Sequence, residues 1–166
     1  MASAGCWKRS VVLKVFKQRL VDMFIQDWSG TITEKERFSQ YRSFKVVFEK
    51  EMYIDDFKTT FLRTAMAQFR LGVLPLNNNL YRFSDELCKR NCPFCINAEE
   101  TEFHFIFACP MYLDLRVRML NMASQLPLSV LQKASNTGRN SCIAKFIVYG
   151  MKRRNQALTQ EQDMNE

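Results

Sequence analysis

One spacing of cysteine and histidine constrains this chain more than any other feature: Cys92-x2-Cys95-x8-His104-x4-Cys109. A CxxC pair at a turn brings two thiolates close enough to share one ion, and a histidine and a third cysteine can supply the other two corners of a tetrahedron. The chain has a single histidine, and it falls in register with these cysteines. Because protein fills all four positions, the pattern predicts a structural zinc site and not a hydrolytic one.

The remaining cysteines fit a metal site less well. Cys88 is a rival ligand, but its three-residue gap to Cys92 makes a poorer turn than CxxC. We expect Cys6 and Cys142 to be packing residues. The alternative to a metal site is a set of unrelated buried cysteines with a hydrogen-bonded core histidine, and the register of the only histidine favours the metal.

The composition is that of an ordinary globular protein that can bury a core: 166 residues, of which 47% are hydrophobic and 25% charged. Lys14 and Lys17 interrupt the apolar residues near the N-terminus, so no secretory signal is expected. No stretch approaches the roughly 18 apolar residues of a membrane helix. We therefore expect an intracellular protein, cytoplasmic or nuclear and without a membrane partner, whose cysteines are free thiols or metal ligands.

The spacing of apolar residues predicts a mainly α-helical fold class, because such residues recur at three- and four-residue steps along most of the chain. Helices are expected over 8–27 (ended by Ser29-Gly30), from a capping box at Thr33 and Glu36 to about 48, from Asp55 or Asp56 to Gly72, from Pro110 to Met122, and over 142–156. A short strand is expected at Leu80–Phe83 and a loop at Ser135–Ser141. Most of the 14 phenylalanines are expected in the core.

These elements divide the chain into four segments. Residues 1–79 form a helical segment of about three helices, and 80–125 hold a small irregular Cys-Cys-His-Cys zinc knuckle with the helix that follows it. Residues 126–158 are a linker and a C-terminal helix, and 159–166 are a disordered tail.

Tyr53-Ile54-Asp55-Asp56 matches the Tyr-x-Asp-Asp signature of polymerase palms, in which two aspartates hold catalytic metals. A palm would place a strand on each side, whereas here the charged residues 49–51 precede the motif and a helical pattern follows it. The motif is therefore interpreted as a helix start. A metal-dependent nuclease is the weakest hypothesis, because no carboxylate cluster accompanies the zinc set, and the chain is not expected to be an enzyme.

The charge balance favours an anionic partner. The chain carries 24 Lys and Arg against 17 Asp and Glu, a net charge of +7 concentrated toward its two ends. A basic surface binds phosphates, and aromatic side chains can stack on unpaired bases. The candidate nucleic-acid contacts are Lys89, Arg90, Phe94, Lys152, Arg153 and Arg154. Phe94 could equally pack against the knuckle, and solvated helix faces explain the charges nearly as well.

Several short blocks carry a family resemblance. They are Tyr41–Lys45, Phe69–Gly72, Cys92–Cys95, Glu100–Phe105, Cys109–Tyr112 and Leu115-Arg116. Over about residues 30–120, their order and spacing resemble the C-terminal region of LINE-type (non-LTR) retrotransposon reverse transcriptases. In that family, a helical stretch and a reverse-transcriptase zinc-binding domain follow the polymerase. Ala144–Ile147 with Arg153 or Arg154 is similar to the family's closing helix.

The resemblance implies that Cys92, Cys95, His104 and Cys109 are zinc ligands and that the region helps a reverse transcriptase core to hold RNA or target DNA. The chain lacks a palm, fingers and an endonuclease, so no polymerase activity is implied. We expect a non-catalytic, zinc-binding fragment of a retrotransposon polyprotein that binds RNA or single-stranded DNA, with RNA favoured. The alternative is a protein–protein interaction module stabilised by structural zinc.

Overall fold

The structure is a computed structural model that describes residues 8–43, 45–95, 97–120 and 137–163. Over these residues the chain is helical and contains no strand, only an isolated antiparallel bridge between Asn91 and Glu99. The mainly α fold class is confirmed. The chain divides into two compact units, Met1–Glu49 and Lys50–Glu166, so the division falls inside the expected segment 1–79.

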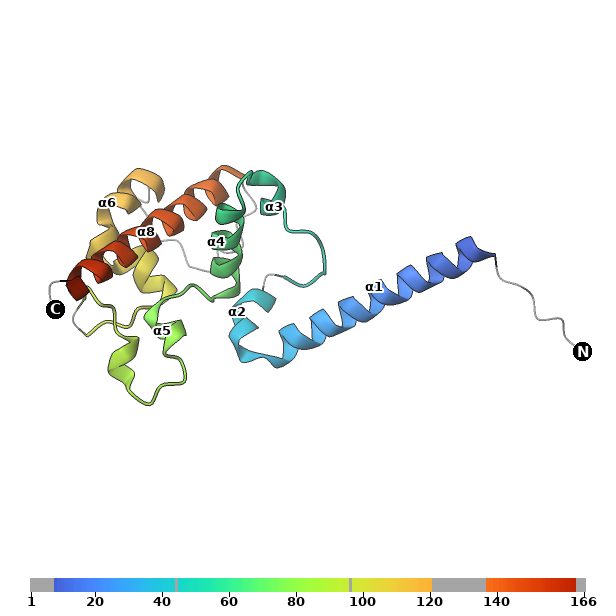
Figure 1. The fold of residues 1–166 in the computed structure, drawn as a ribbon, viewed down its shortest axis with the longest axis horizontal. Coiled ribbons are helices and arrows are strands. Elements are labelled where there is room, and N and C mark those ends of the chain that lie inside the picture. Colours follow the sequence, from blue (N-terminus) through green and yellow to red (C-terminus); the bar gives the residue numbers. More distant parts are fainter. Residues whose placement is uncertain (1–7, 44, 96, 121–136, 164–166) are drawn as a thin grey trace, which may run out of the picture. The chain divides into compact units, whose positions relative to one another are not determined.

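The first unit consists of the long helix α1 (Arg9–Glu34), a single 3-10 turn (Glu36–Phe38) and the short helix α2 (Ser39–Arg42), which packs against α1 (Figure 1). The predicted stop at Ser29-Gly30 is wrong, because α1 continues through both residues, and Thr33 lies within α1 and not in a capping box. A single glycine in a helix interior costs only about 1 kcal/mol relative to alanine, which is too little to end this helix.

The second helix of this unit is much shorter than the expected stretch to about residue 48. Arg42 donates hydrogen bonds to the carbonyl oxygens of Ile32 and Thr33, and these contacts hold α2 at the end of α1. The chain beyond α2 is irregular, and the Phe48 ring packs edge-on against Phe24 and Trp28, with ring centroids 5.3 Å apart in each pair. Packing against α1 therefore replaces the predicted helical turn.

The second unit is built around α8 (Thr137–Asp163), which packs against α3 (Tyr53–Asp56), α4 (Thr60–Leu71) and α6 (Leu113–Leu115). In Figure 1, α4 and α6 lie on opposite sides of α8. A further helix, α5 (Asn77–Leu80), lies between α4 and the cysteine segment in the sequence.

The core of this unit is an aromatic cluster that joins the cysteine segment to α8. Phe105 lies 4.7 Å from Tyr112 and 5.5 Å from Phe146 between ring centroids, and all three side chains are at most 1% exposed. Gly150 allows this approach, because a Cβ at that position would lie 2.7 Å from Cζ of Phe105. The second unit thus has one core, to which the predicted zinc segment contributes directly.

Several helix boundaries differ from the predictions. Gly72 ends α4 in the left-handed conformation, with φ of 66°, as predicted. Residues 137–141, expected in a loop, and 159–163, expected in a tail, belong to α8. The expected strand Leu80–Phe83 is the end of α5 and a turn. The helix expected from Pro110 is a 3-10 turn (Pro110–Tyr112), α6 and a π-helical segment (Arg116–Leu120).

Burial also departs from the expectation at several residues. Ile143, Phe146 and Ile147 are buried in α8, as predicted. Cys142 is exposed and is not a packing residue. Not every phenylalanine belongs to the core, and the exposed ones among the described residues are Phe16, Phe24, Phe48, Phe61, Phe83 and Phe103. The predictions for Cys6, for the end of the Pro110 helix at Met122 and for residues 135–136 lie outside the described residues. Among the described residues, no helix is both long and apolar enough to cross a membrane.

Candidate metal centre

Cys92 and Cys95 lie at a tight turn that a short antiparallel pairing closes. The backbone N–H of Cys92 donates to the carbonyl of Ala98 over 2.7 Å, and that of Cys95 donates to the carbonyl of Cys92 over 3.4 Å. Asn97 takes the left-handed conformation, with φ of 58°, which asparagine tolerates better than most residues do. The loop therefore turns within a few residues and presents both thiols together.

The other two candidate ligands come from a helical segment with an unusual turn. The N–H of Cys109 donates to the carbonyl of His104 over 2.8 Å, the five-residue step of a π-helix. In an α-helix, residues five apart are rotated by about 140° around the axis, so His104 and Cys109 would diverge. The wider turn brings them toward one side. Thr101 accepts a hydrogen bond from the N–H of His104 (3.1 Å) and thereby caps this segment.

The ligand atoms of the four side chains lie close enough together to share one metal ion. The ligand atoms of Cys92, Cys95, His104 and Cys109 all lie within 4.8 Å of one another. Sγ of Cys109 is 3.9 Å from Sγ of Cys92 and 3.7 Å from Sγ of Cys95. Sulfurs at about 2.3 Å from a tetrahedral zinc lie about 3.8 Å apart, whereas a disulfide needs about 2.0 Å. The spacing fits ligands that share one ion.

His104 supplies a further observation in favour of a metal. Its Nε2 is buried and has no hydrogen-bond partner among the described residues. Buried polar atoms are nearly always satisfied, and a metal ion bound with the three thiols would satisfy this nitrogen. The donor set of three sulfurs and one imidazole nitrogen is one that zinc binds in structural sites. The residues present therefore fit a metal ion.

Burial sets the protonation of this site in the absence of a cation. It raises the pKa of the Cys92 and Cys109 thiols, that of Cys109 to about 12, and it lowers the pKa of His104. At neutral pH the two thiols are therefore protonated and the imidazole is neutral. A divalent cation favours the thiolates, so its binding releases protons from the site.

A buried arginine, which the sequence analysis missed, ties the site to the following helix. Arg116 donates to the carbonyl of Cys109 over 2.5 Å and to that of Ile106 over 3.3 Å, and it is 9% exposed. Its positive charge lies beside the cysteine-rich loop. In the sequence, Arg116 was named only as part of the Leu115-Arg116 block that carries the family resemblance.

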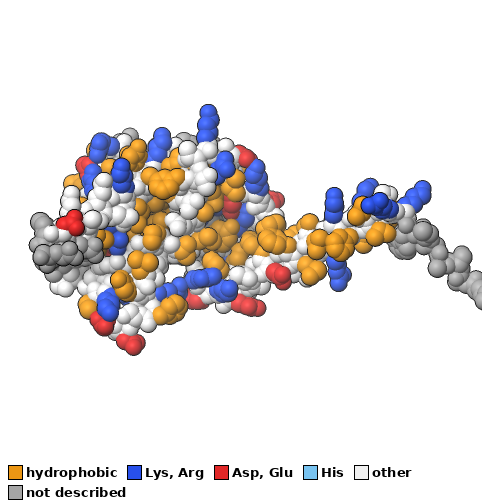
Figure 2. Space-filling model, in the orientation of Figure 1, with side chains coloured by type: hydrophobic (Ala, Val, Ile, Leu, Met, Phe, Trp, Pro, Cys, Tyr) orange, Lys and Arg blue, Asp and Glu red, His pale blue; other side chains and the backbone are white. Residues whose placement is uncertain are grey.

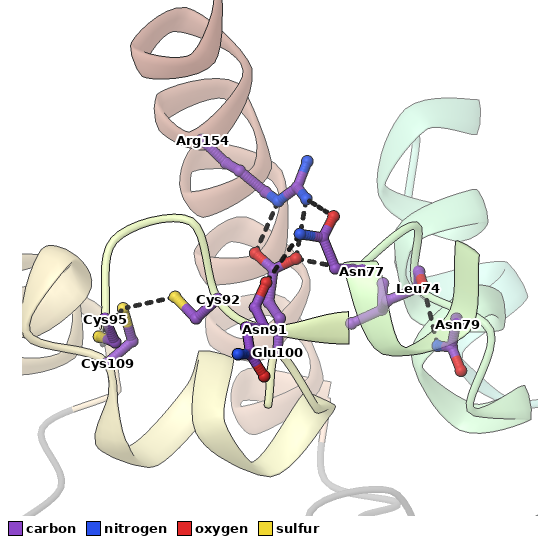
Figure 3. A network of polar contacts seen from close by, with 9 residues as sticks. All are labelled: Leu74, Asn77, Asn79, Asn91, Cys92, Cys95, Glu100, Cys109 and Arg154. Atoms are coloured by element: carbon purple, nitrogen blue, oxygen red, sulfur yellow. Dashed lines mark hydrogen bonds and ion pairs between the residues drawn. The ribbon is translucent and has the colours of Figure 1, made fainter. Parts of the chain in front are cut away.

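A second buried network lies beside the cysteine turn and centres on Glu100 (Figure 3). Glu100 is 1% exposed, and its two carboxylate oxygens accept hydrogen bonds from Nε and a terminal nitrogen of Arg154, each over 2.7 Å. Asn77 donates its backbone N–H to Glu100 over 2.7 Å and its side-chain amide to the carbonyl of Asn91 over 2.8 Å. The network joins α5, the cysteine turn and α8.

This network corrects the prediction for Arg154. The side chain is 5% exposed, and its guanidinium also donates to Oδ1 of Asn77 over 2.7 Å. Arg154 therefore has a structural role and offers no surface to a phosphate. Sequence reasoning included Glu100 only in the Glu100–Phe105 block and missed Asn77, because a lone glutamate and an asparagine at a turn carry no signal of burial.

The other predicted nucleic-acid contacts have different settings. Arg153 donates to both carboxylate oxygens of Asp114 and to the carbonyl of Met111. Arg90 donates to the carbonyls of Tyr81, Arg82 and Ser84. Phe94 packs against the core, with its ring centroid 6.4 Å from that of Tyr112. Lys152 is exposed, and the exposed Lys89 forms an ion pair with Glu86. The two lysines are the members of this set that present charge to solvent most freely.

Comparisons with protein-family models, with curated proteins and with solved structures find no match for this chain.

Proposed function

We propose that this chain is a non-catalytic module that binds RNA or single-stranded DNA and whose second unit is stabilised by a structural zinc ion held by Cys92, Cys95, His104 and Cys109. The observation that carries the zinc is the convergence of four protein ligand atoms within 4.8 Å, with sulfur spacings that match the edges of a tetrahedron. Four protein ligands leave no position for a reactive water, which supports a structural role.

Zinc at this site would contribute to folding as well as to local geometry. Two ligands lie in the turn at 92–95, and two lie at the ends of the π-helical segment that carries the core residues Phe105 and Ile106. One ion would join these two segments, and binding at such sites is worth about 10–16 kcal/mol in small peptides. A contribution of this size rivals the whole stability of a typical domain.

The proposed nucleic-acid surface lies mainly on α1. Its first half and the residue before it carry five exposed cationic side chains and no acidic residue over positions 8–21: Lys8, Arg9, Lys14, Lys17 and Arg19. This density of exposed positive charge suits phosphates. We do not include Arg90, Arg153 and Arg154 among the proposed contacts, because each is buried or bonded to other protein groups. The resemblance to the region that follows LINE-type polymerases supports the same partner, and we include an origin as a fragment of such a polyprotein in the proposal.

The test is the affinity of the zinc-loaded chain for single-stranded RNA and DNA over a salt series. Log affinity should fall linearly with log salt concentration, and the triple variant Lys14→Gln/Lys17→Gln/Arg19→Gln should lower the slope by about two. The control Lys58→Gln/Lys145→Gln removes exposed lysines from the second unit and should leave the slope nearly unchanged. Salt-independent binding, or no binding, would refute the nucleic-acid proposal.

A groove on the second unit favours a protein partner as the alternative. It lies between α4 and α8 and has a volume of about 680 Å³, and its lining includes Phe61, Ala65, Ile147 and Met151. Phe61 is 66% exposed, although it lies on the helix that contributes Phe69 to the core. Exposed apolar side chains around a groove are typical of protein interaction sites. This alternative would be supported if the chain binds no nucleic acid and if Phe61→Ser abolishes its binding to a protein partner.

A further inference from the structure

One side of α1 carries large apolar side chains that the structure leaves open to solvent. Six of them lie within a strip about 120° wide and are between 49% and 60% exposed: Val12, Leu13, Phe16, Leu20, Met23 and Phe24. Figure 2 shows hydrophobic side chains along this helix, between lysine and arginine side chains. Phe48 of the same unit contacts the edge of the strip at Phe24. An exposed apolar strip of this length indicates an interaction surface.

The strip has an internal symmetry about position 18. At 100° per residue, its centre lies directly opposite Gln18, and its members occur in pairs equally distant from that residue. The pairs are Phe16 with Leu20, Leu13 with Met23, Val12 with Phe24, and Arg9 with Asp27. The three inner pairs are apolar, and the outer pair joins opposite charges.

We propose that α1 pairs antiparallel with α1 of a second copy of this chain across a twofold axis near residue 18. In a twofold interface, residue i of one copy meets residue j of the other, and j meets i in return. The symmetry of the strip therefore places apolar side chains opposite apolar side chains along its whole length. It also places Arg9 opposite Asp27 of the other copy at both ends.

The charges select this arrangement over a parallel one. A parallel pair in register would set Arg9 against Arg9 and Asp27 against Asp27, whereas the antiparallel pair joins opposite charges twice. The spacing 9, 13, 16, 20, 23 and 27 alternates steps of four and three residues, which is the heptad spacing that lets two helices interlock. The same symmetry matches Lys17 with Arg19 of the other copy near the axis, and a parallel pair would likewise match like charges there. Their long side chains extend from the edges of the strip into solvent, where water screens this repulsion.

The opposite side of α1 is less suited to such a contact. Its centre is polar: Gln18 and Asp22 are joined by a hydrogen bond of 2.8 Å, and Lys14 lies beside them. The exposed apolar residues around this centre are β-branched and carry no aromatic ring: Val11, Val15, Val21 and Ile25. Val21 belongs to this side and is 49% exposed, close to the 51% of Leu20 on the strip. Leu20 and Val21 are thus neighbours of equal exposure on different faces, which makes them a matched pair for a test.

The test is sedimentation equilibrium of the zinc-loaded full chain over a range of micromolar concentrations. The native chain should be a dimer, and Leu20→Asp should raise the dimer dissociation constant by about 100-fold, because each copy loses an apolar contact near the axis and places a carboxylate in an apolar interface. Val21→Asp should leave it within about threefold. A native chain that is monomeric, or a Leu20→Asp variant that stays dimeric, would overturn the proposal.

A charge exchange tests the direction of pairing without disturbing the apolar strip. Arg9→Asp and Asp27→Arg should each weaken the dimer by about tenfold, and the double variant Arg9→Asp/Asp27→Arg should restore it. Failure of the double variant to recover would overturn the antiparallel register. A monomer whose α1 amides are nonetheless protected from hydrogen exchange would show that the rest of the chain covers the strip, which also overturns the proposal.

Discussion

Arg153 and Arg154 are neighbours on α8, and each forms an ion pair with a carboxylate, but the structure predicts opposite consequences for their removal. Arg154 pairs with Glu100, and the two side chains are 6% and 1% exposed. Arg153 pairs with Asp114, and these side chains are 32% and 52% exposed. Replacement of each arginine by methionine keeps most of the side-chain volume and removes the charge, so the two variants compare a buried with an exposed ion pair.

We expect Arg154→Met to destabilise the protein by about 3–5 kcal/mol, because it leaves the buried Glu100 carboxylate without its cation. Loss of the hydrogen bond to Asn77 adds to this cost. For a folded unit of this size, the melting temperature should fall by roughly 10–20 °C. The assay is thermal and urea-induced unfolding of the zinc-loaded chain, followed by circular dichroism.

Arg153→Met is the matched control and should change the melting temperature by only a small part of that amount, since water screens the charge it leaves behind. The double variant Glu100→Leu/Arg154→Met should recover much of the stability lost in Arg154→Met, because it leaves no buried charge. Equal effects of Arg153→Met and Arg154→Met would refute the reasoning from burial. So would a loss below about 1 kcal/mol for Arg154→Met.

Three other predictions follow from the metal site and the core. Cys95→Ser should abolish stoichiometric zinc in native mass spectrometry and lower the melting temperature, whereas the exposed Cys142→Ser should do neither; zinc retained by Cys95→Ser would contradict the ligand assignment. Zinc affinity, measured against a competing chelator, should rise with pH through the neutral range. Burial raises the pKa of the Cys92 and Cys109 thiols, and below those pKa values protons compete with the metal for the sulfurs. A zinc affinity that does not change with pH would contradict this prediction. Gly150→Ala should cost about 1–3 kcal/mol in urea unfolding, because its Cβ would lie 2.7 Å from Phe105. Gly30→Ala, with nothing within 4 Å of the added Cβ, should be neutral or stabilising, and equal effects of the two substitutions would contradict the packing argument.

Local patterns predicted the features of this protein that local physics controls. The spacing of Cys92, Cys95, His104 and Cys109 indicated a shared ion, and the four side chains do meet. The glycine after α4 takes the left-handed conformation that the sequence predicted for it. Helical periodicity identified the fold class, because side chains three and four residues apart share a helix face whatever the helix packs against.

Helix boundaries were less predictable, because packing overrides weak local signals. Ser29-Gly30 predicts the end of a helix, yet α1 continues through both residues. The apolar spacing before Phe48 predicts a helix, yet Phe48 lies outside a helix and contacts Phe24 and Trp28. A stop signal of about 1 kcal/mol yields to such tertiary contacts. The apolar strip of α1 shows a related limit. The spacing of its apolar residues can be recognised in the sequence, but the exposure of these side chains to solvent cannot.

The sequence by itself determined which residues can bind a metal and that the chain is helical, because both depend on spacing along one short stretch. Only the tertiary structure decided which charges are available to a partner. Arg153 and Arg154 are identical side chains in adjacent positions, and α8 turns by about 100° between them. One turns toward Glu100 in the interior and the other toward Asp114 at the surface. The partner of a charge depends on which distant segment packs beside it, and no local pattern contains that information.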